Sequence, residues 1–173
     1  RYCRQGCRSL AEACALDQVG RQPVTMMQDQ WSSDAGTLAK RLLAKHFATM
    51  FPQGLVIGCD HKMVLSSAAA ALGAMPQMGP ATPLPTSGSA GAGSDNRLAG
   101  ELISLMLILK LDETQLDFSP NSAPLAQLQV ATGAFEGWRV AEVASEANRV
   151  LGGCTSSYTA AQIFDVVQDI NQS

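Results

Sequence analysis

The segment 97–111 limits the possible folds of this chain more than any other stretch, because it is apolar on nearly every side of a helix. Its large apolar residues are Leu98, Leu102, Ile103, Leu105, Met106, Leu107, Ile108 and Leu109. A helix without a polar face is covered by other elements on all sides, so the pattern predicts the central helix of a core. Gly100 lacks a Cβ atom and would let a neighbouring element approach closely.

The same segment is too short to cross a membrane. Its apolar stretch is bounded by Glu101 and interrupted by Lys110, whereas a spanning helix needs about 18 or more apolar residues in a row. The chain contains no such run, so we expect no membrane span.

Three amphipathic helices are predicted around this core. The first covers 34–50, with an apolar stripe of Leu38, Leu42, Leu43, Phe47 and Met50. The second covers 139–151 and ends at two glycines; its apolar positions are Val140, Val143, Ala144, Ala147, Val150 and Leu151. The third begins at Thr159, which forms a capping box with Gln162; its stripe is Ile163, Phe164, Val167 and Ile170. All three match the helical period.

The remaining segments predict a small β element and a long loop. Short strands are expected at 55–57 and 62–65, joined by a turn, with a further short strand at 128–131. Ser66 or Ser67 can cap a helix over the alanines that follow, until Gly73 and Pro76 end it. Residues 76–96 are rich in Pro, Gly, Ser and Ala, which is typical of a loop or linker.

Together these patterns predict a mainly α (α+β) fold, a single-domain helical bundle with a small β-hairpin and a long Pro/Gly/Ser-rich loop. A length of 173 residues suits one domain. We expect an N-terminal cysteine-containing arm at 1–30 and a globular domain at 31–173 that includes the loop 76–96.

The charges are few and unevenly placed. Residues 1–62 hold eight Lys/Arg and five Asp/Glu, whereas residues 63–173 hold four and ten. The formal net charge of −3 offers no basic footprint for nucleic acid. The asymmetry indicates either unevenly solvated faces or head-to-tail attraction between subunits.

Three of the five cysteines, Cys3, Cys7 and Cys14, lie within the arm. Their spacing matches no common zinc or iron–sulfur motif. On a helix they would share a face, and His46 or His61 could add a fourth metal ligand, but we expect no metal site.

The other two cysteines, Cys59 and Cys154, are flanked by turn residues. Disulfides suit such positions, and closing a loop of this length would contribute about 4–5 kcal/mol in the chain-entropy view. All five cysteines are therefore disulfide candidates, and the alternative is buried free thiols in a cytosolic protein. Because five is odd, one cysteine must be free, bound to something else or paired with another chain.

No catalytic motif is present, and we expect no enzyme and no cofactor. Asp60 and His61 are adjacent in a turn, and no Gly-x-Ser-x-Gly sequence supplies a nucleophile. The acidic residues between Asp112 and Asp117 could hold a cation but are more typical of a solvated helix end. Trp31 and Trp138 are interpreted as packing or interface residues.

Several motifs occur in the order seen in a group of largely uncharacterised secreted bacterial surface proteins. They are "FATMFPQGLVIGC" with "MVLSSAAAALGAMPQMG" (47–79), "NRLAGELISLMLILKLD" (96–112), "GAFEGWRVAEVASEANRVLGGC" (133–154) and "YTAAQIFDVVQDIN" (158–171). They resemble that group's "LAGQL…LKLN" and "GxFxGxxVxxVxxxANxxLGG" motifs and its final helix. The group's N-terminal "C…TQGYW" motif is matched here only by Cys3, Gln5 and Gly6.

The resemblance implies export to the cell surface or the extracellular space, no known reaction, and a Cys59–Cys154 disulfide. The start at Arg1, without a basic and apolar leader, is typical of a processed mature chain. We expect a secreted, non-enzymatic structural or adhesive protein, a homo-oligomer or polymer such as a subunit of a filament or sheath. The alternative is an extracellular carbohydrate- or cation-binding module, with a surface glycan as one partner, that uses the 76–96 loop, the Trp138 loop or the acidic 112–117 edge.

Overall fold

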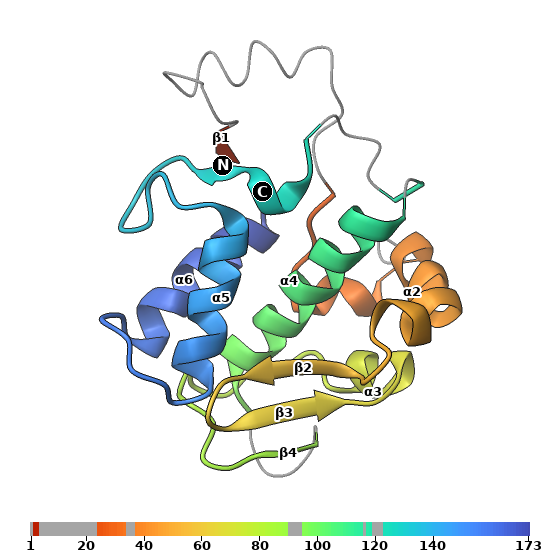
Figure 1. The fold of residues 1–173 in the computed structure, drawn as a ribbon, viewed down its shortest axis with the longest axis horizontal. Helices are drawn as coiled ribbons and strands as arrows, with labels where there is room; N and C mark the ends of the chain where they lie inside the picture. The colour runs from red at the N-terminus through yellow and green to blue at the C-terminus, as the bar shows by residue number, and fades with distance from the viewer. Residues whose placement is uncertain (1, 4–23, 34–36, 90–94, 116, 119–122) are drawn as a thin grey trace.

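The chain has a mixed α+β fold, shown in Figure 1. This computed structural model describes residues 2–3, 24–33, 37–89, 95–115, 117–118 and 123–173. Its longer helices are α2 (Thr37–Met50), α4 (Arg97–Thr114), α5 (Val140–Leu151) and α6 (Ala160–Asn171). The predicted fold class is therefore confirmed at the level of α+β.

Helix α4 lies at the centre of the molecule, and the prediction of a central helix is confirmed. The Asn96 side chain accepts hydrogen bonds from the first N–H groups of the helix, which satisfies donors that have no partner within it. Buried residues follow on every side of α4, from Leu98 to Leu111. Helices α2, α5 and α6 pack against it (Figure 1).

The three amphipathic helices form where the periodicity predicts them, with one difference in α2. Its buried positions are Ala39, Leu43, Phe47 and Met50, whereas Leu38 is 40% exposed. Successive side chains of a helix point about 100° apart around its axis. Because Ala39 faces the core, Leu38 points away from it. In α6 the predicted capping box is present, because Gln162 N–H donates to Thr159 and Thr159 N–H donates to Gln162.

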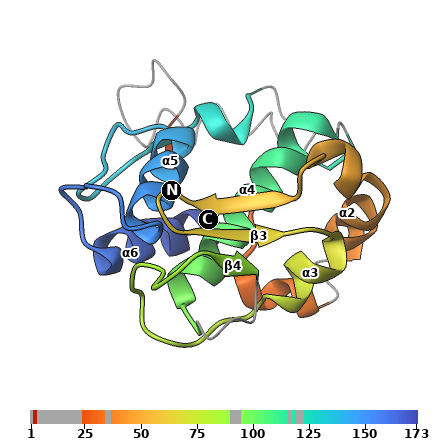
Figure 2. The same cartoon turned by 60° about the horizontal axis from the view of Figure 1, so that its bottom comes forward.

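A small sheet lies across α4, as Figure 2 shows. Strands β2 (Leu55–Gly58) and β3 (Lys62–Leu65) form an antiparallel hairpin close to the predicted bounds. Their alternate residues Leu55, Ile57, Met63 and Leu65 are buried, while the cross-strand partners Val56 and Val64 are each 40% exposed. Helix α3 (Ala68–Gly73) follows, capped by Ser67.

A third strand comes from the segment that the sequence predicts as a loop. Strand β4 (Gly88–Ser89) pairs with β3 in parallel. The same segment buries Leu84, whose N–H donates to the Leu151 carbonyl. Part of 76–89 is thus built into the sheet and the core.

Described residues of the N-terminal part contact the domain through a strand and a 3₁₀ helix. Strand β1 (Tyr2–Cys3) pairs antiparallel with β5 (Gln129–Val130), which follows the 3₁₀ turn η3 (Leu125–Gln127). The 3₁₀ helix η1 (Gln28–Ser32) packs on α4. The boundary expected between residues 30 and 31 therefore falls inside η1.

Trp31 in η1 is a packing residue, which is one of the two roles predicted for it. It is 3% exposed and belongs to the core, and its indole N–H donates to Ser104 Oγ of α4 over 2.6 Å. The Ser104 hydroxyl in turn donates to the Met26 carbonyl. Trp31 packs in the core because the polar partner on α4 lets the whole indole be buried.

Candidate functional site

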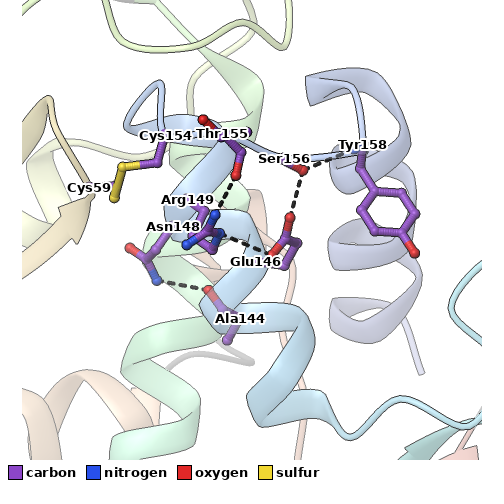
Figure 3. Close-up of polar contacts among 9 residues, drawn as sticks. All are labelled: Cys59, Ala144, Glu146, Asn148, Arg149, Cys154, Thr155, Ser156 and Tyr158. Atoms are coloured by element: carbon purple, nitrogen blue, oxygen red, sulfur yellow. Dashed lines mark hydrogen bonds and ion pairs between the residues drawn. A yellow bond between two sulfur atoms is a disulfide. The ribbon is translucent and has the colours of Figure 1, made fainter.

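A disulfide joins Cys59, directly after β2, to Cys154, which follows α5 (Figure 3). The Cα atoms are 6.0 Å apart and the residues are separated by 95 positions. Gly152 makes the approach possible, since a Cβ atom there would lie 1.8 Å from Cys59 N. Gly58 N–H also donates to Asn148 Oδ1 over 2.8 Å. The structure thus contains the pair that the resemblance implies.

Polar side chains of α5 hold the loop that follows the disulfide (Figure 3). The Ser156 hydroxyl donates to Glu146 Oε1 over 2.6 Å and accepts from Tyr158 N–H. Arg149 donates to the Thr155 carbonyl and lies 3.4 Å from Glu146 Oε2. These contacts satisfy the backbone between α5 and α6, so this cluster serves the architecture.

Among the described residues, the possible metal ligands beside the disulfide do not make an ordinary metal site. The sulfur atoms of Cys59 and Cys154 and the carboxylate of Asp60 lie within 4.8 Å of one another, but sulfurs in a disulfide are not thiolate ligands. The ring of His61 donates through Nδ1 to the Leu84 carbonyl over 2.7 Å. His61 therefore holds β4's segment against the hairpin.

The three remaining disulfide candidates are the cysteines of the N-terminal arm. Cys7 and Cys14 lie outside them. Cys3 lies in β1, in register with Gln129 of β5. That one of the five cysteines is free, bound to something else or paired with another chain stays a prediction.

Trp138 belongs to a three-ring cluster at the start of α5. It meets the rings of Phe135 and Tyr158 edge-on, with centroids 5.3 and 5.7 Å away. Phe135 is buried, whereas Trp138 and Tyr158 are half-buried. Edge-to-face pairs of this kind stabilise a packed cluster, and they leave part of two rings accessible.

A groove of about 240 Å³ lies beside this cluster, between α6 and the loop after β5. Its walls combine apolar and polar groups: Val130, Thr132, Gly133, Ala134, Phe135, Gln162, Asp165, Val166, Asp169 and Ile170. Asp165 and Asp169 are exposed and one helical turn apart. We treat this groove as the candidate functional site, since it combines a hollow, an apolar floor and two carboxylates.

The sequence analysis did not single out Asp165 and Asp169. In the sequence, the only feature that marks them is the i, i+4 spacing of two carboxylates on the polar face of a predicted helix. That signal alone is common on solvated helices, and only the fold places the loop 130–135 opposite them to form a groove.

Two of the acidic residues considered for cation binding, Asp112 and Glu113, already form contacts within the protein. The Asp112 carboxylate accepts the Leu125 N–H over 2.6 Å, and Glu113 pairs with Lys110 over 2.7 Å. Asp117 is exposed. The first two carboxylates therefore support η3 and the end of α4.

One carboxylate lies deep inside the protein. Glu101 of α4 is 1% exposed and accepts from Asn171 Nδ2 over 2.7 Å and from Gln28 N–H over 3.4 Å. Burial raises the pKa of Glu101 above its ordinary value of 4.5, and these hydrogen bonds oppose the shift. Asn171 Oδ1 has no hydrogen-bond partner among the described residues. The site is enclosed by η1 and α6, so it is structural.

In the described parts of the chain, no helix is long and apolar enough to span a membrane. Comparison with family models, curated proteins and solved structures finds no match to this chain. Function is therefore argued from the residues and their arrangement alone.

Proposed function

We propose that this protein is a secreted, non-enzymatic structural or adhesive protein of a bacterial surface, and that its copies assemble head to tail into a filament or sheath. The observation that carries the proposal is that two exposed basic residues lie on α2 and two exposed acidic residues lie on α6. Helices α2 and α6 lie at the two ends of the long axis (Figure 1). Arg41 and Lys45 are exposed on α2, and Asp165 and Asp169 are exposed on α6.

Two further carboxylates extend the acidic end. Glu136, in the loop beside the groove, and Glu142, in the first turn of α5, are both exposed. Complementary potentials steer copies toward one another and select their orientation. Ends of like charge repel, so head-to-tail contact is favoured over head-to-head contact.

The Cys59–Cys154 disulfide supports the extracellular part of the proposal. Structural disulfides form and persist in oxidising compartments, and they are rare in cytosolic proteins. In this proposal residues 31–173 act as one helical-bundle domain with the loop 76–96, and residues 1–30 act as an arm that bears cysteines. The partners are other copies of the chain rather than nucleic acid.

The test is the oligomeric state of the purified chain under non-reducing conditions. We expect the weight-average mass in sedimentation velocity to rise with protein concentration at low salt. A mass that stays at that of one chain up to millimolar concentration would overturn the proposal.

A second candidate function is carbohydrate binding at the groove. It is favoured by the carboxylates, the Gln162 amide and the half-buried rings of Trp138 and Tyr158, since sugars are held by hydrogen bonds and by ring faces. Titration of a soluble glycan panel should then quench tryptophan fluorescence and release heat. Absence of both signals across the panel would exclude it.

A further inference from the structure

The outer face of α2 is a continuous stripe that no described element covers. Leu38, Arg41, Lys45 and Ala48 recur at helical spacing and are all exposed. Leu38 is 40% exposed, although it is a large apolar residue. Neither Arg41 nor Lys45 forms an ion pair within the part of the chain that the structure describes. The stripe therefore offers one apolar and two basic side chains to a partner.

The groove at the other end has matching features. Asp165 and Asp169 stand four residues apart on α6, as Arg41 and Lys45 do on α2. Four residues correspond to a rise of about 6 Å along either helix, so the two charge pairs have the same spacing. The floor of the groove includes Val166 and Phe135, which can contact an apolar side chain.

We propose that α2 of one copy docks along the groove of a second copy. Arg41 and Lys45 pair with Asp165 and Asp169 there, and Leu38 lies over the apolar floor. This inference rests on the proposed function and names the two surfaces that carry out the assembly.

The placement of these surfaces determines the kind of assembly. They are different patches of the same chain, so the contact is heterologous, and a heterologous contact that does not close into a ring continues as an open filament. In Figure 1 the two patches belong to helices at opposite ends of the long axis, an arrangement that favours growth over closure.

The experiment reverses the charges of each surface separately. One variant is R41E/K45E and the other is D165K/D169K; all four side chains are exposed, so both variants should keep the circular dichroism spectrum of the original chain. Each alone should weaken self-association at least tenfold in sedimentation velocity at low salt. The matched controls K62E and D117K reverse exposed charges outside both surfaces and should leave association unchanged.

Mixing the two variants provides the decisive readout. The unchanged groove of R41E/K45E can bind the unchanged α2 of D165K/D169K, and the two reversed surfaces also attract each other. An equimolar mixture should therefore recover the mass of the original chain. A mixture that stays dissociated would overturn the inference.

The failure of this inference can be separated from failure of the proposed function. If the original chain associates and neither double variant changes that association, the assembly uses other surfaces and the docking of α2 is wrong. If the original chain never associates, both the docking and the proposed function are wrong.

Discussion

At the scale of single residues, the centre of α4 depends on an unusual neighbour. The Gln28 side chain crosses the helix at Gly100, where an added Cβ atom would lie 1.8 Å from Gln28 Oε1. Gln28 Oε1 accepts the Gln77 N–H over 2.8 Å, and Gln28 Nε2 donates to the Gln77 carbonyl over 3.0 Å. Because Gly100 has no side chain, the Gln28 side chain approaches α4 closely there, and this agrees with the close approach predicted from the sequence.

The first prediction concerns that contact. Gly100→Ala should lower the free energy of unfolding by about 1–3 kcal/mol, because the buried Gln28 amide must move and its hydrogen bonds weaken. Urea denaturation measures the change. Gly73→Ala is the matched control: Gly73 ends α3 and has open space around it, so alanine should change stability little or raise it by about 0.4–1 kcal/mol. Equal effects at both positions would contradict the argument.

The second prediction concerns Glu101, beside Gly100. Because burial raises its pKa above 4.5, the folded protein binds more protons than the unfolded chain between pH 4.5 and the folded pKa. The free energy of unfolding therefore falls as the pH rises through that window. Glu101→Gln removes the titration, so its stability relative to the original chain should be greater at pH 7 than at pH 4.

Thermal denaturation at both pH values measures this difference. Glu113→Gln is the control, since Glu113 is exposed and pairs only with Lys110 among the contacts described. A stability difference between Glu101→Gln and the original chain that is the same at pH 4 and pH 7 would show that Glu101 does not titrate in this way.

At the scale of elements, a disulfide and two hydrogen bonds join the β2–β3 hairpin to the end of α5. The Cys59–Cys154 disulfide, the Gly58–Asn148 hydrogen bond and the bond from His61 N–H to the Gly152 carbonyl all connect the hairpin to the end of α5. They lie where β2 packs against α5, so the covalent link adds to the contacts that hold the hairpin there.

The third prediction follows from that link. Replacing both residues (C59S/C154S) should lower the free energy of unfolding by about 2–5 kcal/mol, because the unfolded chain is no longer constrained by a long closed loop. Denaturation without reductant gives the value. The original chain treated with a reductant should lose a similar amount, and the double variant should not respond to the reductant. Equal stability of the double variant and the oxidised chain would contradict the prediction.

At the scale of the whole molecule, exposed charges of opposite sign lie on two different helices, α2 and α6. The basic residues of α2 and the acidic residues of α6 belong to helices on opposite sides of α4 (Figures 1 and 2). Among the described residues, no ion pair joins the basic residues of α2 to the acidic residues of α6. In the proposed assembly, these charges meet between two copies.

The fourth prediction tests this electrostatic origin. The Debye length falls from about 30 Å at 0.01 M salt to about 8 Å at 0.15 M, so the apparent dissociation constant for self-association should rise steadily with NaCl concentration. Sedimentation velocity at several salt concentrations measures it. Sucrose, which changes viscosity and not screening, is the control. Association that strengthens with salt would indicate an apolar interface instead.

Local pattern was sufficient to predict the four longer helices and the β2–β3 hairpin. The all-round apolar segment predicts α4, the i, i+3, i+4 stripes predict α2, α5 and α6, and the alternation at 55–65 predicts the hairpin. The capping box at Thr159 is equally local. In each case the residues that decide the structure lie within one or two turns of each other, so periodicity and capping chemistry determine the outcome.

Contacts between distant residues were decided only by the tertiary structure. The burial of Trp31 depends on Ser104, and the pairing of β4 with β3 depends on a loop composition that predicts no strand. The groove exists because the loop after β5 meets α6, whose carboxylates have no distinctive local signal. The sequence by itself determined the four longer helices and the β2–β3 hairpin, since those depend on neighbouring residues. Only packing around α4 decided which segments meet, because that depends on the burial of side chains from the whole chain at once.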